Sequence, residues 1–339
     1  MSAGQVLTGL SPPGRGLSLG TVRHYIRAMR VVLFALLLSL FAVAGISRAQ
    51  ESPVTPMNLS LAPEKVESIY APPEASQEEQ LGNTGAVKFD LTVGFWTDYF
   101  FRGIDRSESG GSEDSPNILI DGSMRFDLGR YPSLILGVFA NIYDSDPISR
   151  FQEISPYFAL ELNARPITLK VGNTFYIYPD RDDFNTAEVW AKMTFDDSYF
   201  FRSEDPILHP YVLAAWDYDT YNGLYVELGI RHDFEIQDTP LVISPIARIA
   251  YVSGDKMFRQ PTGPTPDPAF DFGSTGTDSG FQHYDLGLEV TFGLNSIARI
   301  PARYGRLDLK GYIFYTDGIE DHLRADTDLY GGVGIAFSY

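Results

Sequence analysis

Apolar and polar side chains alternate along the chain, most regularly in its last twelve residues. From Asp328 to Tyr339 the odd positions are mostly apolar or aromatic, and the even positions are mostly small or polar. A period of two residues predicts a β-strand with one apolar face, and not a helix. The open hydrogen-bonding edge of such a strand needs a partner, which the first strand of a closed barrel can provide. We therefore interpret 328–339 as the closing strand of a β-barrel.

Eleven further segments carry the same alternation, at lengths close to the roughly ten residues of a tilted membrane strand. The most regular is 284–294, whereas 241–252 contains Pro245, which would remove a ladder hydrogen bond. An even number of strands is expected when both chain ends lie on the same side of the membrane. The sequence thus predicts an all-β fold, a transmembrane antiparallel up-and-down β-barrel of about 12 strands. The other nine predicted strands are 87–95, 118–128, 134–143, 154–163, 167–177, 188–195, 207–218, 224–231 and 306–316.

The connections indicate which way the strands run. If the first strand runs outward, the longest connection, 253–279 with four prolines, lies outside the cell, where long loops are expected. Two connections fit less well, because 219–222 is short for an outer loop and 196–206 is long for an inner turn. The predicted outer connections are 103–116, 144–150, 179–186, 219–222, 253–279 and 317–327.

A soluble β-sandwich is the main competing fold, because its strands alternate too. Its outer faces would meet water and carry more Lys and Glu, whereas the polar positions here are rich in Gly, Thr, Ser and Tyr. Apolar faces also run through all twelve segments, which is more surface than one sandwich core can bury. The pattern favours the membrane barrel.

The amino-terminal region predicts export. The apolar run 31–45 has 15 residues, and a helix that crosses a bilayer needs about 20. Arg30 precedes this run and Ser47-Arg48-Ala49 follows it, which is the arrangement of a secretory signal peptide. We place the signal peptide at 1–49, with Met29 as an alternative start of translation. A single membrane anchor is the competing interpretation.

The residues after the signal divide into a tail and the barrel. Residues 50–86 are rich in Pro, Glu, Ser and Ala and cannot bury enough apolar surface to fold, which predicts a disordered periplasmic tail. The barrel then occupies 87–339. Together with the export signal, this organisation predicts a location in the bacterial outer membrane.

Composition excludes several classes of site. The chain has no cysteine, so it has no disulfide and no thiolate metal site or nucleophile. After removal of 1–49 it carries 21 basic and 44 acidic side chains, a formal net charge of −23, which argues against nucleic-acid binding. Neither a His-x-x-x-His pattern nor a calcium-loop spacing occurs. We predict no cofactor and no metal site.

The segment Thr97-Asp-Tyr-Phe-Phe-Arg-Gly-Ile104 follows the first predicted strand. It resembles the Ser/Thr-Asp-Tyr-x-x-Arg-Gly-Ile motif of an uncharacterised, porin-like family of Gram-negative outer-membrane β-barrel proteins. The resemblance implies an outer-membrane location and supplies no agreed substrate. If the first strand continues through the motif, Asp98 and Arg102 lie on one face, point inward and form an ion pair in the lumen.

Charge is concentrated in the predicted outer loops, which contain 18 acidic and six basic residues. An acidic mouth attracts cations and repels anions. The same acids are also explained by loop solubility, or by divalent cations shared with lipopolysaccharide phosphates. The inward strand positions mix both signs, and a 12-strand barrel lies between plugged and water-filled sizes. The candidate lumen-lining residues are Asp90, Asp98, Arg102, Asp121, Arg125, Lys170, Glu188, Lys192, Glu227, Arg231, Arg248, His283, Asp285, Glu289, Arg306, Asp308 and Lys310.

Three functions compete at this point. The first is a small porin-like channel for passive diffusion of cationic or neutral solutes. The second is a structural or adhesive barrel without transport. The third is a hydrolase in the barrel wall, for which His283 with Ser279 and Asp285 is the nearest set, but no Gly-x-Ser-x-Gly elbow occurs, and we predict no catalytic residue.

The expected partners follow from the location. They are outer-membrane lipids and lipopolysaccharide, and the barrel-assembly machinery, which would bind the C-terminal strand. The solute, the oligomeric state and the state of the lumen, open or plugged, are left open by the sequence.

Overall fold

Twelve antiparallel strands form one closed sheet in this computed structural model. The structure describes residues 86–107, 117–129, 132–143, 152–179, 184–203, 205–254 and 279–339. The predicted signal peptide, nearly all of the predicted tail, and part or all of four predicted outer loops lie outside these residues. Among the residues described, no helix is both long and apolar enough to cross a membrane.

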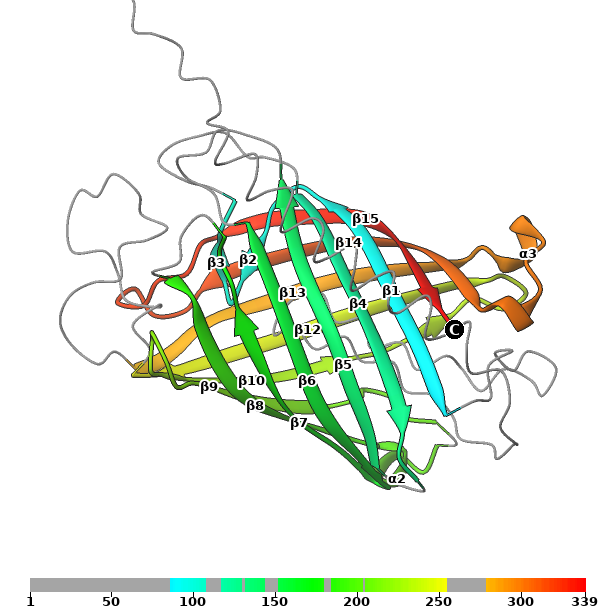
Figure 1. Ribbon diagram of the computed structural model, residues 1–339, viewed down its shortest axis with the longest axis horizontal. Coiled ribbons are helices and arrows are strands. Elements are labelled where there is room, and N and C mark those ends of the chain that lie inside the picture. The colour runs from blue at the N-terminus through cyan, green and yellow to red at the C-terminus, as the bar shows by residue number, and fades with distance from the viewer. Residues whose placement is uncertain are drawn as a thin grey trace, which may run out of the picture. The chain divides into compact units, whose positions relative to one another are not determined.

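All twelve predicted strands are present, and each pairs with the next along the chain (Figure 1). The sheet closes because β1 also pairs with β15, while β10 pairs with β12. The strands are β1 (Val87–Trp96), β4 (Asn117–Asp127), β5 (Pro132–Tyr143), β6 (Glu153–Ala164), β7 (Ile167–Tyr176), β8 (Thr186–Phe195), β9 (Tyr211–Asp217), β10 (Leu224–Arg231), β12 (Leu241–Ser253), β13 (Ser279–Gly293), β14 (Arg306–Gly318) and β15 (Asp328–Ser338).

Shorter strands and helical turns lie outside these twelve strands. The short strand β11 extends the edge next to β12, and β2 and β3 pair only with each other. Three helical turns lie in the described parts of the connections. The bounds are β2 (Phe100–Phe101), β3 (Ile104–Asp105), β11 (Phe234–Glu235), α2 (Ser198–Phe201), α3 (Asn295–Ala298) and η4 (Ala302–Tyr304).

The last strand closes the barrel against the first, as predicted. Strands β1 and β15 pair from Asp90↔Ser338 to Trp96↔Gly332. Beyond this register, Phe89 and Tyr339 exchange reciprocal backbone hydrogen bonds of 2.7 and 2.8 Å. Gly332 is required here because a Cβ at this position would lie 2.7 Å from the Trp96 indole. In Figure 1 the red β15 accordingly runs beside the cyan β1.

Alternate side chains face the interior and the outside. In β10, Tyr225, Glu227 and Arg231 are buried, whereas Leu228 on the other face is 53% exposed. The same alternation of exposed apolar and buried polar residues continues in β7 and β14. An outward apolar face combined with a polar interior is the arrangement of membrane-spanning barrels.

The two ends of the barrel differ in their connections. We call the end where β1 begins and β15 finishes the terminal end, and the opposite end the hairpin end. The connections at the terminal end are 128–131, 165–166, 196–210, 232–240 and 294–305. Those at the hairpin end are 97–116, 144–152, 177–185, 218–223, 254–278 and 319–327.

Pro245 lies inside β12 without interrupting it. It stands opposite His232, in the gap between β10 and β11, and its carbonyl oxygen accepts the His232 amide hydrogen at 3.1 Å. The donor that proline lacks would therefore point to a place where the ladder is already interrupted. This location explains why β12 continues through the proline.

Two strand boundaries differ from the prediction. Strand β9 begins at Tyr211 and not at 207, because 196–210 forms a long turn that contains α2. Strand β13 begins at Ser279 and not at 284, because a register shift against β12, between Ile249 and Tyr251, allows pairing to continue. That shift is the mark of a β-bulge.

Candidate functional site: a hairpin inside the barrel

The chain leaves the barrel wall directly after β1. Strand β1 ends at Trp96, so the prediction that one strand continues through the motif is wrong. The motif instead forms the β2–β3 hairpin, in which Phe101 pairs with Ile104. Its two central residues, Arg102 and Gly103, have φ of 54° and 69°. Positive φ at both central positions is the requirement of a type I′ hairpin turn, which glycine satisfies best at the second position.

Arg102 reaches across the interior to the opposite wall. Its Nη2 donates to Glu188 Oε2 on β8 at 2.7 Å, and its Cζ lies 4.4 Å from the centre of the Tyr225 ring on β10. The Tyr176 hydroxyl on β7 donates to the other Glu188 oxygen at 2.9 Å. Asp98 and Arg102 do not lie on one extended strand as expected, and an ion pair between them stays a prediction. Both side chains are buried.

Arg106, just after β3, makes a second set of contacts with the wall. Its Nη1 donates to the Tyr178 hydroxyl at 2.6 Å and lies 3.6 Å from Glu153 Oε2. The Tyr99 hydroxyl donates to the same Glu153 oxygen at 2.7 Å. Burial lowers the pKa of Arg106, but the neighbouring tyrosines and Glu153 raise it above its ordinary value, so the guanidinium stays charged. Burial and then Glu153 raise the pKa of Tyr99, which therefore stays a donor.

Aromatic rings pack the hairpin against three further parts of the wall. Tyr99 stacks with Phe139 of β5 at a centroid distance of 6.0 Å, and Phe100 stacks with Tyr330 of β15 at 4.3 Å. Phe101 meets Tyr176 of β7 edge to face at 5.6 Å. The contacts therefore reach strands on opposite sides of the closed sheet, and the hairpin spans the interior at this end.

The bulge in β13 presents two consecutive side chains to the hairpin. Gln282 and His283 are both fully buried, although neighbouring strand residues normally face opposite sides. Gln282 Nε2 donates to the Arg102 carbonyl oxygen at 2.7 Å and to the Arg324 carbonyl oxygen at 2.8 Å. The His283 ring lies so close to Gly103 that a Cβ there would be 2.6 Å from the ring. The bulge thus aims both side chains at the turn of the hairpin.

The connection 319–327, at the hairpin end of the barrel, also binds the β2–β3 hairpin. The Asp326 amide donates to the Gly103 carbonyl oxygen at 2.7 Å, and Asp326 Oδ2 accepts the Asp105 amide hydrogen at 2.8 Å. Burial raises the pKa of the Asp326 carboxyl. Nearby, Asp98, Asp105 and Asp328 bring carboxylate oxygens within 4.8 Å of one another. The sequence does not reveal this acidic cluster, because Asp328 comes from the far end of the chain.

Gly103→Ala is expected to loosen the hairpin. Alanine at φ 69° costs about 1–2 kcal/mol in backbone conformation, and its Cβ would also collide with the His283 ring. Gly311→Ala on β14 is the matched control, because nothing lies within 4 Å of a Cβ there. Urea unfolding in detergent micelles, followed by tryptophan fluorescence, should show the loss only for Gly103→Ala. Equal midpoints for the two variants would contradict the packing of this turn.

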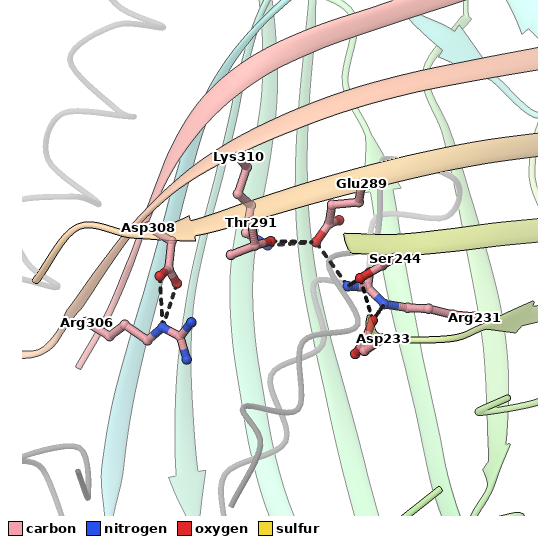
Figure 2. Close-up of polar contacts among 8 residues, drawn as sticks. All are labelled: Arg231, Asp233, Ser244, Glu289, Thr291, Arg306, Asp308 and Lys310. Carbon is pink, nitrogen blue, oxygen red and sulfur yellow. Dashed lines mark hydrogen bonds and ion pairs between the residues drawn. The ribbon is translucent and has the colours of Figure 1, made fainter. Parts of the chain in front are cut away.

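Toward the terminal end, charges on the wall pair with one another (Figure 2). Arg231 donates to Asp233 at 2.6 Å, to Ser244 at 2.8 Å and to Glu289 at 3.1 Å. Lys310 lies 3.5 Å from the same Glu289 oxygen. This network ties β10, β12, β13 and β14 together inside the barrel. In the same region of Figure 2, Arg306 pairs with Asp308 of its own strand at 2.8 Å.

A second ionic group lies on β4, β6 and β7. Glu161 accepts from Arg125 and from Asn163, and its other oxygen lies 2.9 Å from Lys170 Nζ. Arg125 Nε also lies 3.5 Å from Asp127. Two cations therefore share one fully buried carboxylate.

A third group lies between the hairpin and these networks. Arg248 pairs with Asp285 at 3.0 Å, and His283 Nε2 lies 3.6 Å from the same carboxylate. Glu227 accepts from the Tyr225 hydroxyl at 2.8 Å, and Lys192 Nζ lies 3.9 Å from the centre of the Tyr211 ring, a cation–π contact.

Most of the seventeen candidate residues belong to these groups. Fourteen are buried, and Asp90, Asp121 and Arg306 are half-buried. Asp121 accepts from the Tyr157 hydroxyl at 3.2 Å. That these residues line a path for a solute stays a prediction. Sequence reasoning did not single out Arg106, Glu153, Gln282 or Asp326, and the only available signal for any of them was the motif that precedes Arg106.

The three residues considered for a hydrolase, Ser279, His283 and Asp285, do not come together in one site. Ser279 is exposed and its hydroxyl donates to the Ser253 hydroxyl at 3.1 Å, whereas His283 is buried against Gln282 and the hairpin. The bulge between them places the two side chains on opposite faces of β13. The His232 ring contacts the Ile207 carbonyl oxygen at 2.5 Å near the terminal end.

Comparison with known proteins finds distant structural likeness only. No protein-family model matches this sequence, and no curated protein sequence matches it either. LpxR from Salmonella typhimurium is a similar solved structure, with 11% identity and a TM-score of 0.40 over 73% of this chain and 99% of its own. An outer membrane channel from Pseudomonas putida F1 has 8% identity and a TM-score of 0.38 over 79% of this chain and all of its own.

The translocator domain of the autotransporter NalP from Neisseria meningitidis has 10% identity and a TM-score of 0.36, over 75% of this chain and 89% of its own. At these identities and TM-scores the likeness carries no argument about function.

Proposed function

We propose that the protein is a bacterial outer-membrane β-barrel that forms a small channel for cationic or neutral solutes, and that the β2–β3 hairpin closes this channel in the conformation described. The outward apolar face of the strands supports membrane insertion. The predicted signal peptide and closing aromatic strand support the route to the outer membrane.

The hairpin end faces the outside of the cell in this proposal. Its connections are longer on the whole than those of the terminal end, as in outer-membrane barrels. It also carries the acidic connections of the sequence analysis, among them 319–327 with Glu320, Asp321 and Asp326. A mouth of this charge concentrates cations and repels anions.

One observation carries the proposal of a closed channel. The hairpin is attached to the interior by ion pairs, hydrogen bonds and ring contacts with β5, β6, β7, β8, β10, β13 and β15. Strand β1 tethers it at Trp96, and β2 and β3 pair with each other and with none of the described strands of the barrel wall. It can therefore leave while the twelve strands stay paired.

Replacing 98–106 by a Gly-Ser linker of equal length is expected to open the barrel. In planar bilayers the wild-type protein should give rare, small, cation-preferring steps. The variant should stay open at least about tenfold longer, since the contacts that closed the lumen no longer oppose opening. Reversal potentials in a salt gradient measure the cation preference.

The control is the fold of the variant, checked by the heat-dependent gel mobility and the β-type circular dichroism of the refolded barrel. A folded variant that stays silent would contradict the channel. A wild type that conducts steadily would contradict closure by the hairpin.

A structural barrel without transport is the second candidate, and the ionic groups favour it. Glu161 and Glu289 each gather two cations from different strands, which stiffens the wall beyond the hairpin. If these groups also fill the interior, removal of the hairpin leaves the lumen closed. The silent outcome of the same experiment would support this candidate.

A further inference from the structure

We infer that the wall carboxylates Glu188 and Glu153, with the tyrosines around them, form binding sites for the guanidinium or ammonium groups of a solute, and that the hairpin occupies these sites with its own Arg102 and Arg106. This inference rests on the proposed channel and names the class of solute that opens it.

The first site has the parts that recognise a guanidinium group. Glu188 offers Oε2 to the cation, and the Tyr176 hydroxyl holds its Oε1 at 2.9 Å. The face of Tyr225 lies 4.4 Å from the Arg102 Cζ. A carboxylate beside an aromatic face combines a charge-assisted hydrogen bond with a cation–π contact, which suits the planar guanidinium. All three wall residues belong to β7, β8 and β10, so the site persists without the hairpin.

The second site places a carboxylate of β6 beside a tyrosine of the connection 177–185. Glu153 is fully buried, lies 3.6 Å from Arg106 Nη1 and accepts from the Ser155 hydroxyl at 2.5 Å. The Tyr178 oxygen accepts from Arg106 at 2.6 Å. Tyr99, which also donates to Glu153, comes from the hairpin segment and would leave with it.

Opening and binding are coupled by the charge of these two carboxylates. When the hairpin leaves, Arg102 and Arg106 leave together, and Glu188 and Glu153 lose their cations inside the barrel. Water then reaches the two carboxylates, but the charge-assisted contacts to the guanidinium groups are lost, which disfavours that state. A cationic solute restores these contacts, whereas a neutral solute of the same shape does not. The hairpin arginines and a cationic solute therefore compete for the same two carboxylates, and binding of the solute favours the open channel.

Arginine and citrulline provide a direct test, because citrulline replaces the guanidinium by a neutral ureido group of similar shape. In bilayers with wild-type protein, millimolar arginine should raise the open fraction at least about tenfold over citrulline. Lysine should be weaker than arginine, since an ammonium group does not match the planar site.

Binding is measured separately on Arg102→Gln/Arg106→Gln, in which the hairpin no longer supplies cations. Isothermal titration of this refolded variant should show arginine binding and no citrulline binding. Adding Glu188→Gln should weaken arginine binding at least about tenfold, which corresponds to a loss of about 1.4 kcal/mol. Heat-dependent gel mobility establishes that each variant is folded, and the wild-type bilayer experiment needs no variant.

The outcomes separate this inference from the proposed function. If the barrel without its hairpin conducts, but arginine and citrulline have equal effects on the wild type and bind the variant equally, the solute sites are refuted and the channel stands. If the barrel without its hairpin is silent, the channel itself fails. Arginine binding that survives Glu188→Gln and Glu153→Gln together would also overturn the inference.

Discussion

Arg102→Ala is expected to lower the free energy of unfolding by about 3–5 kcal/mol, because it leaves Glu188 buried without its cation. The substitution also removes the contact between the guanidinium and the Tyr225 ring. Since Glu188 is solvated only when the hairpin moves away, the same variant should conduct more often than the wild type in bilayers. Urea unfolding in micelles and single-channel recording measure the two effects on one preparation.

Arg165→Ala is the matched control for loss of an arginine. Arg165 lies in the turn between β6 and β7, 3.9 Å from Asp196, and its side chain is 89% exposed. Exposed ion pairs contribute about 0–1 kcal/mol, so this variant should unfold and conduct as the wild type does. If Arg102→Ala gave the same small change, Arg102 could not be the buried anchor of the hairpin.

Arg231→Met is expected to destabilise the barrel by about 3–5 kcal/mol without opening it, because it removes one partner of a buried network. Arg231 is the cation shared by Asp233 and Glu289, and Lys310 at 3.5 Å is a more distant substitute for Glu289. The network lies toward the terminal end, and the hairpin contacts do not include it. Unfolding midpoints should fall while the conductance of the folded fraction stays at the wild-type level.

Arg306→Ala tests the same region with an ion pair that is less buried. Arg306 pairs with Asp308 two residues away, and its side chain is 24% exposed. The expected loss is about 1 kcal/mol or less, since water solvates the remaining carboxylate. An Arg306→Ala effect as large as that of Arg231→Met would show that burial does not decide the strength of these pairs.

The strands could be predicted from sequence because a membrane barrel repeats one constraint at every second residue. The apolar positions of 328–338 had to face outward together, and this fixed the strand, its facing and its need for β1 as a partner. Pro245 does not interrupt the strand, because the backbone N–H that proline lacks would point to the gap between β10 and β11. The regular alternation of apolar and polar positions therefore predicts the strands that form the barrel wall.

The hairpin could not be predicted by the same reasoning. The chain leaves the wall after Trp96, and two positive φ angles at Arg102 and Gly103 then reverse its direction to form the hairpin. A bulky residue such as arginine rarely adopts positive φ, so the sequence favours the extended interpretation. Its partner Glu188 lies 86 residues away, and no spacing rule joins the two.

The bulge at Gln282 and His283 is the other feature that the alternation of residues does not predict. A bulge reverses the facing of the strand after it, so Gly280 and Asp285 both face inward although one number is even and the other odd. The alternation correctly predicts that His283 and Asp285 face the interior, but it does not predict that Gln282 faces the interior too. Local pattern thus predicts which face a residue takes, whereas contacts across the interior depend on the closed fold.

A disulfide between Gly103→Cys and His283→Cys tests the position of the hairpin most directly, since the chain has no other cysteine. A Cβ at Gly103 would lie 3.0 Å from the His283 Cβ, close to the separation of about 3.5–4.5 Å in disulfides. Oxidation of the folded double variant should form the crosslink within the chain and silence the channel until a reductant is added. Thiols that stay free in the folded barrel and react with a membrane-impermeant maleimide from outside would contradict a hairpin held inside the barrel.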